Sequence, residues 1–489
     1  MFMRWVLITE SSQQAGIEAL YHQSHPYSTW SLSLKRTLQD GYYLLIICSA
    51  LFLLLGLGVS RVDFMSVPDF QGVYFGVKAL LAHHDPYVDR NVVEVFHQRL
   101  SADRVKDLGD VAPPFASKQV YPPTTLLLFV PFALLSVAEA QQLWMVILAV
   151  SVVIAAFAVM HLAAQSASTL SGVLVGFTVA TSLSLVMTGN LAALSVSLCL
   201  IAAWSWIEGK FIREGVLCCA LSLAIKPQDA GFVWLFFLLS GGHYTKRSLQ
   251  AFALVAVCSL VALAWIFPVA PNWISESATN LKSMMQRGGV NDPGPLGQTS
   301  HSTGMVIDLQ AAISYIRDEP RLYDTVTYAV CGTLITLWAI AALRSRPSRR
   351  LIFLGLAAIA PLTLLITYHR LYDAKILLLA VPACAVLWSE HGRHAWPSLV
   401  ITSLAIVFTS DIPLYCLVWL DKHFLPGSIE SGGSVLGLFV ERPTPILLLL
   451  MALYYQCLYL GHVFGRESHL FLGTACAVKE PADGPNASH

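Results

Sequence analysis

The sequence predicts an all-α protein that crosses a lipid bilayer about twelve times. Of its 489 residues, 56% are hydrophobic and only 12% are charged, whereas about a quarter of the residues in soluble domains are charged. The mean hydropathy is +0.63, and the charged residues gather between long apolar runs. Because backbone amides must pair within hydrocarbon, these runs are expected to be helices.

Twelve apolar runs qualify as membrane spans. The first follows forty mostly polar residues and is long enough to cross the bilayer, which favours a retained helix over a cleaved signal peptide. The predicted spans are 41–59, 121–136, 141–163, 170–187, 190–207, 215–239, 249–268, 324–343, 351–368, 374–388, 398–415 and 444–463.

The orientation follows from lysine and arginine in short loops, which favour the cytoplasmic side. Lys246, Arg247 and the arginines of 344–350 fall on the side of both chain ends. The predicted organisation is a cytoplasmic segment 1–40, a transmembrane domain 41–464 with outer loops 60–120, 269–323 and 416–443, and a disordered cytoplasmic tail 465–489.

Several classes of partner are not predicted. The chain has 30 lysine and arginine residues and 30 aspartate and glutamate residues, so its formal net charge is zero. It therefore lacks the positive charge that would indicate binding to nucleic acid. The ten cysteines show neither CxxC nor Cys/His spacing, so neither a disulfide framework nor a metal site is expected. No cofactor is expected either.

The first outer loop contains a candidate catalytic acid. From Pro68, apolar residues recur at helical spacing, which predicts a helix lying in the membrane interface. Asp69 would then sit at headgroup level, where a general base could take a proton from a hydroxyl group. Asp63 is the reserve candidate. The alternative is that Asp69 only caps the helix.

Lys226 lies deep in an apolar run, followed by Pro227, which loosens the helix. An ionisable residue at that depth costs roughly 3 kcal/mol or more and indicates a functional site, here one for a lipid phosphate. The alternative is a structural pair with a carboxylate such as Asp229, one turn away.

A second polar cluster separates two late spans. Arg370 and Lys375 are suited to hold a phosphate through charge-assisted hydrogen bonds, and His369 could orient it or move a proton. An ordinary charged turn is the alternative. In the loop 269–323, His301 and Asn291 are the expected substrate contacts, in a glycine- and proline-rich stretch that could equally be a plain connector.

In their order, these motifs resemble glycosyltransferase family 87, in the C-type superfamily of polyprenyl-phosphate-sugar-dependent transferases. The resemblance covers about residues 60–390. The motifs that carry it are Asp69, Tyr74, Asp85-Pro86-Tyr87, Tyr121-Pro122-Pro123, Gly189-Asn190, Lys226-Pro227-Gln228 and Tyr368-His369-Arg370-Leu371-Tyr372-Asp373.

The resemblance implies a C-type glycosyltransferase fold in the inner (plasma) membrane, with its active site on the extracytoplasmic face. The donor would be a polyprenyl-phosphate sugar, with mannose as first candidate, and the acceptor a lipid-linked or cell-envelope glycan. The family's catalytic aspartate carries onto Asp69. Donor phosphate binding falls to Lys226, His369, Arg370 and Lys375, and substrate binding to Tyr74, Tyr121, Gln228, Asn190 and His301.

Two other functions compete with this interpretation. A secondary transporter or lipid-linked-sugar flippase would use Lys226 and Asp229 as a coupling pair, although the sequence shows no matching second half. A polysaccharide ligase or polymerase also acts outside on lipid-linked sugars, but typically carries its large loop late in the chain.

Overall fold

The computed structural model describes residues 30–59, 67–99, 118–294, 306–413, 415–416, 438–439 and 441–476. These residues form helices, with one isolated bridge between Val306 and Arg370. The elements are α2 (Trp30–Val59), α3 (Pro68–Leu81), α4 (Asp89–Arg99), α6 (Pro123–Ala133), α7 (Val137–Ala180), α8 (Leu183–Thr188), α9 (Ala192–Glu208), α10 (Ile212–Ile225), α11 (Pro227–Leu239), α12 (Gly242–Ile266), α13 (Trp273–Met285), α14 (Leu309–Ile316), α15 (Pro320–Arg344), α16 (Arg349–Ile366), η1 (Asp373–Ala380), α17 (Val381–Ser389), α18 (Ala395–Phe408) and α21 (Pro443–Cys476).

The helical membrane architecture predicted from the sequence is confirmed. Six stretches of the described chain are long and apolar enough to cross a bilayer: Gln39–Gly56, Val137–Thr188, Gly242–Ile266, Pro320–Arg344, Arg349–Ile366 and Pro443–Gly465. The other predicted spans coincide with shorter apolar helices or with broken ones. The count of twelve crossings stays a prediction.

The helix α7 is folded back on itself at Ala167. That residue has φ −154° and ψ 80°, outside the helical region. The indole Nε1 of Trp144, near the start of α7, donates to the carbonyl of Gly189, just beyond α8, at 2.9 Å. A straight helix rises 1.5 Å per residue and would hold Trp144 far from Gly189. The hydrogen bond between them therefore shows that the two halves of α7 run in opposite directions.

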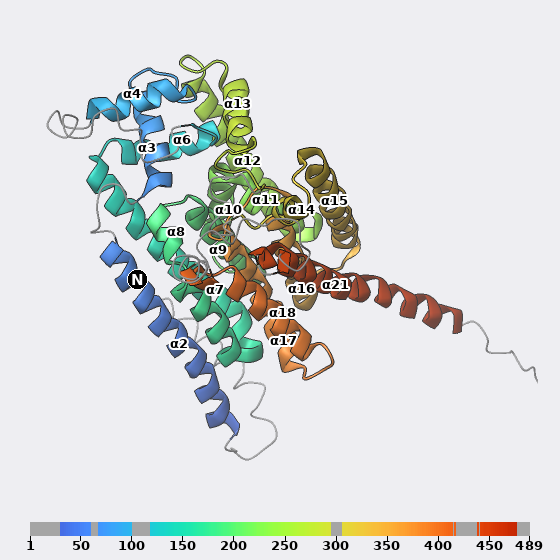
Figure 1. Ribbon diagram of the computed structural model, residues 1–489. Coiled ribbons are helices and arrows are strands. Elements are labelled where there is room, and N and C mark those ends of the chain that lie inside the picture. Colours follow the sequence, from blue (N-terminus) through green and yellow to red (C-terminus); the bar gives the residue numbers. More distant parts are fainter. Residues whose placement is uncertain are drawn as a thin grey trace, which may run out of the picture.

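Small residues let α2 pack closely along the second half of α7 (Figure 1). A Cβ atom added to Gly172 would lie 2.4 Å from the carbonyl oxygen of Gly41. One turn later, Gly176 faces Cys48. Close approach of small residues is a common way for helices to associate in lipid, where hydrophobic exclusion contributes little.

This contact gives a first prediction. Gly172→Ala is expected to lower the free energy of unfolding by about 1–3 kcal/mol, because the new methyl group would overlap backbone atoms that cannot move aside. Gly58→Ala in α2 is the control, since a Cβ atom there meets nothing within 4 Å. Unfolding in mixed detergent micelles measures both variants. Equal stability of the two would contradict the proposed packing.

Helices α3, α4, α6 and α13 gather at one end of the molecule (Figure 1). The side chain of Asn280 in α13 donates to the carbonyls of Tyr87 and Gln119, at 2.9 and 3.1 Å. Ten of the fourteen residues of α3 are buried. The sequence predicted an apolar side lying in the headgroups, but α4 and α6 pack against α3 and the protein itself covers most of its surface.

Burial differs sharply among the long helices. Helix α16 is buried along nearly its whole length, from Leu351 to Leu365. In contrast, α12 exposes large apolar side chains such as Phe252 and Leu260. In a membrane protein such a face is suited to lipid contact. Helix α16 therefore forms the core that carries the next segment, residues 367–372, into the molecule.

Candidate active site

Three interruptions of helical backbone contribute to the site. They lie at Gly189-Asn190 between α8 and α9, at Lys226 between α10 and α11, and at residues 367–372 between α16 and η1. Lys226 has φ −149° and ψ 83°. Non-helical backbone at membrane depth is tolerated where it is buried in protein or lines a polar space. Such breaks commonly mark binding sites in membrane proteins.

Gly189 allows the start of α3 to approach the first break. Its φ of +63° is left-handed, a conformation that glycine adopts at little cost. An added Cβ atom would lie 2.1 Å from Cγ1 of Val67 and 3.1 Å from Cβ of Phe70. Glycine at this position therefore brings Asp69, between those two residues, beside Asn190.

Hydroxyl groups from earlier helices satisfy the carbonyls that the break at Lys226 leaves unpaired. Thr124 donates to the carbonyl of Ala224 at 2.6 Å, and Thr125 donates to that of Ile225 at 2.9 Å. Both threonines lie in the first turn of α6. Since Pro227 has no backbone N–H to donate, these bonds hold the broken backbone in place.

The paired threonines give a second prediction. In Thr124→Val/Thr125→Val, shape is kept but two buried carbonyls lose hydroxyl donors, so stability is expected to fall by about 1–3 kcal/mol. Thr333→Val is the control, because that exposed hydroxyl bonds only within its own helix, to Ala329. Detergent unfolding compares them. A loss no greater than that of the control would show that the break is held by other contacts.

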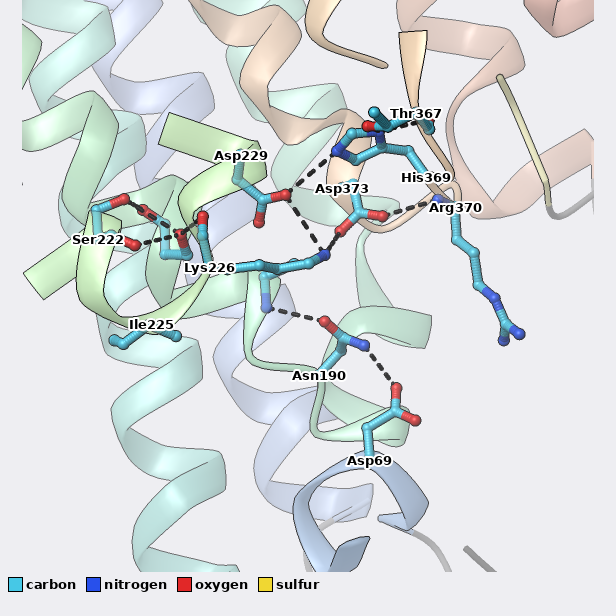
Figure 2. A network of polar contacts seen from close by, with 12 residues as sticks. Asp69, Asn190, Ser222, Ile225, Lys226, Asp229, Thr367, His369, Arg370 and Asp373 are labelled. Atoms are coloured by element: carbon cyan, nitrogen blue, oxygen red, sulfur yellow. Dashed lines mark hydrogen bonds and ion pairs between the residues drawn. The ribbon is translucent and has the colours of Figure 1, made fainter. Parts of the chain in front are cut away.

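Lys226 lies between two carboxylates (Figure 2). Its Nζ forms an ion pair with Asp373 of η1 and lies 3.4 Å from Oδ1 of Asp229 in α11. The same oxygen of Asp229 lies 3.4 Å from Nε2 of His369. All four groups are buried. Buried charges are tolerated when they are paired in this way.

Asp69 is held on the opposite side of the break from Asp229 (Figure 2). Its Oδ2 accepts a hydrogen bond of 2.7 Å from the amide of Asn190, whose own Oδ1 accepts from the backbone of Ala192 at 2.8 Å. Helix α3 shows no side-chain cap hydrogen bond. Burial raises the pKa of Asp69 above its ordinary range, while the Asn190 bond and the charge of Arg370 lower it in part.

Arg370 connects the site to the outer loop. Its backbone N–H donates to Oδ2 of Asp373 at 2.7 Å, while its guanidinium donates to Oδ1 of Asn291 at 3.1 Å and to Tyr368. In Figure 2 its side chain extends away from Asp229. Its charge acts on Asp69 instead. Arg370 thus provides a cation on the side of the site where Asp69 lies.

The other predicted residues are distributed unevenly. Tyr121 lies near enough to Asp69 and Lys226 for both charges to act on its phenol. Gln228 is exposed beside Lys226. In contrast, Tyr74 is buried in α3 with its hydroxyl donating to the carbonyl of Leu135 at 2.8 Å.

Three further residues predicted for the site lie apart from this cluster or outside the described part of the chain. Lys375 packs on another side of η1, where its Nζ lies 3.5 Å from the carbonyl oxygen of Thr409 and near Asp411. It therefore does not join Lys226, because successive residues of η1 point in different directions. Asp63 and His301 lie outside the described residues.

Two members of the cluster were not among the predicted site residues. Asp373 appeared as part of a polar stretch and of a family motif, and Asp229 as a structural partner of Lys226 or, in a transporter, as its coupling partner. The spacing of Arg370 and Asp373 was a local signal, because a carboxylate three residues after an N–H group often accepts from it at a helix start. The pairing of Asp373 with Lys226 spans 147 residues and leaves no local signal.

The arrangement places one carboxylate, Asp69, opposite a set of buried cations. Such a site can take a proton from an attacking group and stabilise negative charge on a leaving group. Among the residues that the structure describes, no group of three or more His, Cys, Asp or Glu side chains could hold a metal ion.

A sequence model of glycosyltransferase family 87 matches residues 120–368, a little over half of the chain. The matched range contains Asn190, Lys226 and Asp229, and it ends one residue before His369. No curated protein matches the chain.

Proposed function

The chain belongs to glycosyltransferase family 87, and on that premise we propose that it transfers a sugar from a polyprenyl-phosphate donor to a lipid-linked or cell-envelope glycan. Mannose is the proposed sugar. The protein would cross the inner (plasma) membrane twelve times, with α3 at the outer interface and the active site on the extracytoplasmic face. The observation that carries this proposal is the position of Asp69 opposite Lys226 and His369, with Arg370 on its own side of the site.

In the proposed reaction, an acceptor hydroxyl attacks the anomeric carbon of the donor sugar, and Asp69 takes its proton. The bond between that carbon and the phosphate oxygen breaks, and its electron pair leaves with the phosphate. Lys226, His369 and Arg370 stabilise the charge that develops there. Attack opposite the leaving group inverts the anomeric centre.

Purified protein in lipid nanodiscs, given radiolabelled polyprenyl-phosphate mannose and a membrane glycolipid extract, tests the proposal. Label should pass to the glycolipid, and polyprenyl phosphate should be released in equal amount. Transport of the donor into proteoliposomes without a covalent product would refute it in favour of a transporter. Transfer of a different polyprenyl-linked sugar would refute only the choice of mannose.

A further inference from the structure

Asp229 has no place in the reaction proposed above, although it is buried at the centre of the site. Neither of its carboxylate oxygens has a hydrogen-bond partner within the described residues, and its contacts there are the two ion pairs with Lys226 and His369. Carboxylate oxygens buried without a hydrogen-bond donor are costly. Their persistence here calls for a specific role.

The hydrogen bonds of His369 fix where its proton lies. Its Nδ1 is 2.9 Å from the carbonyl oxygen of Thr367, and a carbonyl can only accept. Nδ1 therefore carries a hydrogen. The other ring nitrogen, Nε2, is 3.4 Å from Oδ1 of Asp229 and is fully buried.

A neutral imidazole would then direct a lone pair of Nε2 at the carboxylate oxygen, and two buried acceptors would face each other. A proton between them removes this conflict. It can reside on the imidazole or on the carboxylate. The ordinary pKa of imidazole is more than two units above that of a carboxyl group, and the cation of Lys226 at 3.4 Å from the same oxygen favours the ionised carboxylate.

We infer that Asp229 is a positioning residue that keeps His369 as an imidazolium cation throughout the neutral pH range. The inference rests on the proposed function, because the cation matters only if the site receives an anionic group. It provides a second cation beside Lys226, and the two cations share Oδ1 of Asp229 as a partner. The charge of His369 then does not change with pH in that range.

Other charges also act on His369. Asp373 and Lys226 lie on its η1 and α11 sides, Arg370 follows it in the chain, and Asp308 faces it from the start of α14. Burial raises the pKa of Asp308 to about 7. Asp308 therefore titrates in the same range as an ordinary histidine, and an experiment must separate the two.

The test measures binding of undecaprenyl phosphate to the full-length protein in nanodiscs between about pH 5.5 and 8.5, where an ordinary imidazole loses its proton. Uncharged undecaprenol is the reference probe. Affinities of Asp229→Asn are divided by those of the wild type, so that ionisation of the probe itself cancels. The asparagine amide can still donate to a neutral Nε2, which preserves the local geometry.

The Asp229→Asn ratio is expected to fall roughly tenfold as pH rises through the ordinary imidazole pKa, the effect of losing one unit charge near the phosphate. The pH dependence should vanish in Asp229→Asn/His369→Gln and persist in Asp229→Asn/Asp308→Asn. Asp373→Asn is the matched control, because it removes a carboxylate from Lys226 but not the oxygen that faces Nε2. Its ratio should stay flat with pH.

Two results would overturn the inference alone. One is a flat ratio for Asp229→Asn, and the other is a pH dependence that disappears with Asp308→Asn. If Asp229→Asn does not fold, the ratio of wild type to His369→Gln decides the question, since a fixed cation predicts no midpoint near the ordinary imidazole pKa. Wild-type protein that binds undecaprenyl phosphate no better than undecaprenol would instead refute the proposed function.

Discussion

Asp69→Asn is expected to reduce sugar transfer by about 10²–10⁴-fold, the contribution typical of a general base. Asparagine keeps the shape of the side chain but cannot take the proton of the acceptor hydroxyl. Donor binding should change little, because the cations proposed to hold the phosphate remain. Initial rates with the labelled donor measure the first effect, and binding of undecaprenyl phosphate measures the second.

Asp89→Asn is the matched control for this prediction. Asp89 lies in the first turn of α4, as Asp69 lies in the first turn of α3. If Asp69 only interacted favourably with the helix dipole, both substitutions would have similar small effects. Equal rates for the two variants would therefore contradict the assignment of Asp69 as the base and favour a role confined to the start of its helix.

The pH profile of the wild type provides a further check on Asp69. The base must be ionised to act, so transfer should be lost as pH falls through the pKa of the folded protein. Because burial raises that pKa, the acidic limb should lie above the ordinary aspartate value of about 3.9. A limb at or below that value would contradict the proposed role.

Lys226→Met is expected to lower the free energy of unfolding by about 3–5 kcal/mol, because it leaves Asp373 buried without its cation and removes one of the two cations beside Asp229. Transfer should be lost as well, since one phosphate contact disappears. Detergent unfolding measures the first effect. The double variant Lys226→Met/Asp373→Asn should recover part of the stability but none of the activity.

Lys375→Met is the control for a buried lysine. Its removal leaves Asp411 with hydrogen bonds from the backbone and hydroxyl of Ser184, so no carboxylate is left unpaired. The loss of stability should be smaller than in Lys226→Met, and transfer should be retained. Loss of transfer in Lys375→Met at normal stability would contradict this expectation and support the donor-phosphate role that the sequence predicts for Lys375.

The sequence was most informative where one residue forces a local conformation. Gly189 lies between the predicted spans 170–187 and 190–207, and Pro227 predicted a loosened helix within the span 215–239, which the structure shows as a full interruption at Lys226. Both interruptions are present because glycine permits a positive φ and proline cannot donate a hydrogen bond. The helix starting at Pro68 was located correctly for the same reason. Its deep burial was not foreseen, because that depends on α4 and α6.

Features that depend on contacts between distant segments could not be predicted. Periodicity identifies an apolar face, but not which helix covers it. Lys375 and Arg370 both looked suited to phosphate within one short stretch, and only the packing of η1 separates them. The reversal at Ala167, in contrast, lies in the gap between the predicted spans 141–163 and 170–187.

The order in which the chain is synthesised favours assembly of the break at Lys226. Thr124, Thr125 and Ser195 precede it, so their hydroxyls are already in the nascent bundle when its carbonyls leave the ribosome. Asp373 is translated 147 residues later. Until then Asp229, one turn after Lys226, is the nearby carboxylate that can serve as its counter-ion during membrane insertion. The carboxylate proposed to set a protonation state would thus also give Lys226 a counter-ion as the charge enters lipid.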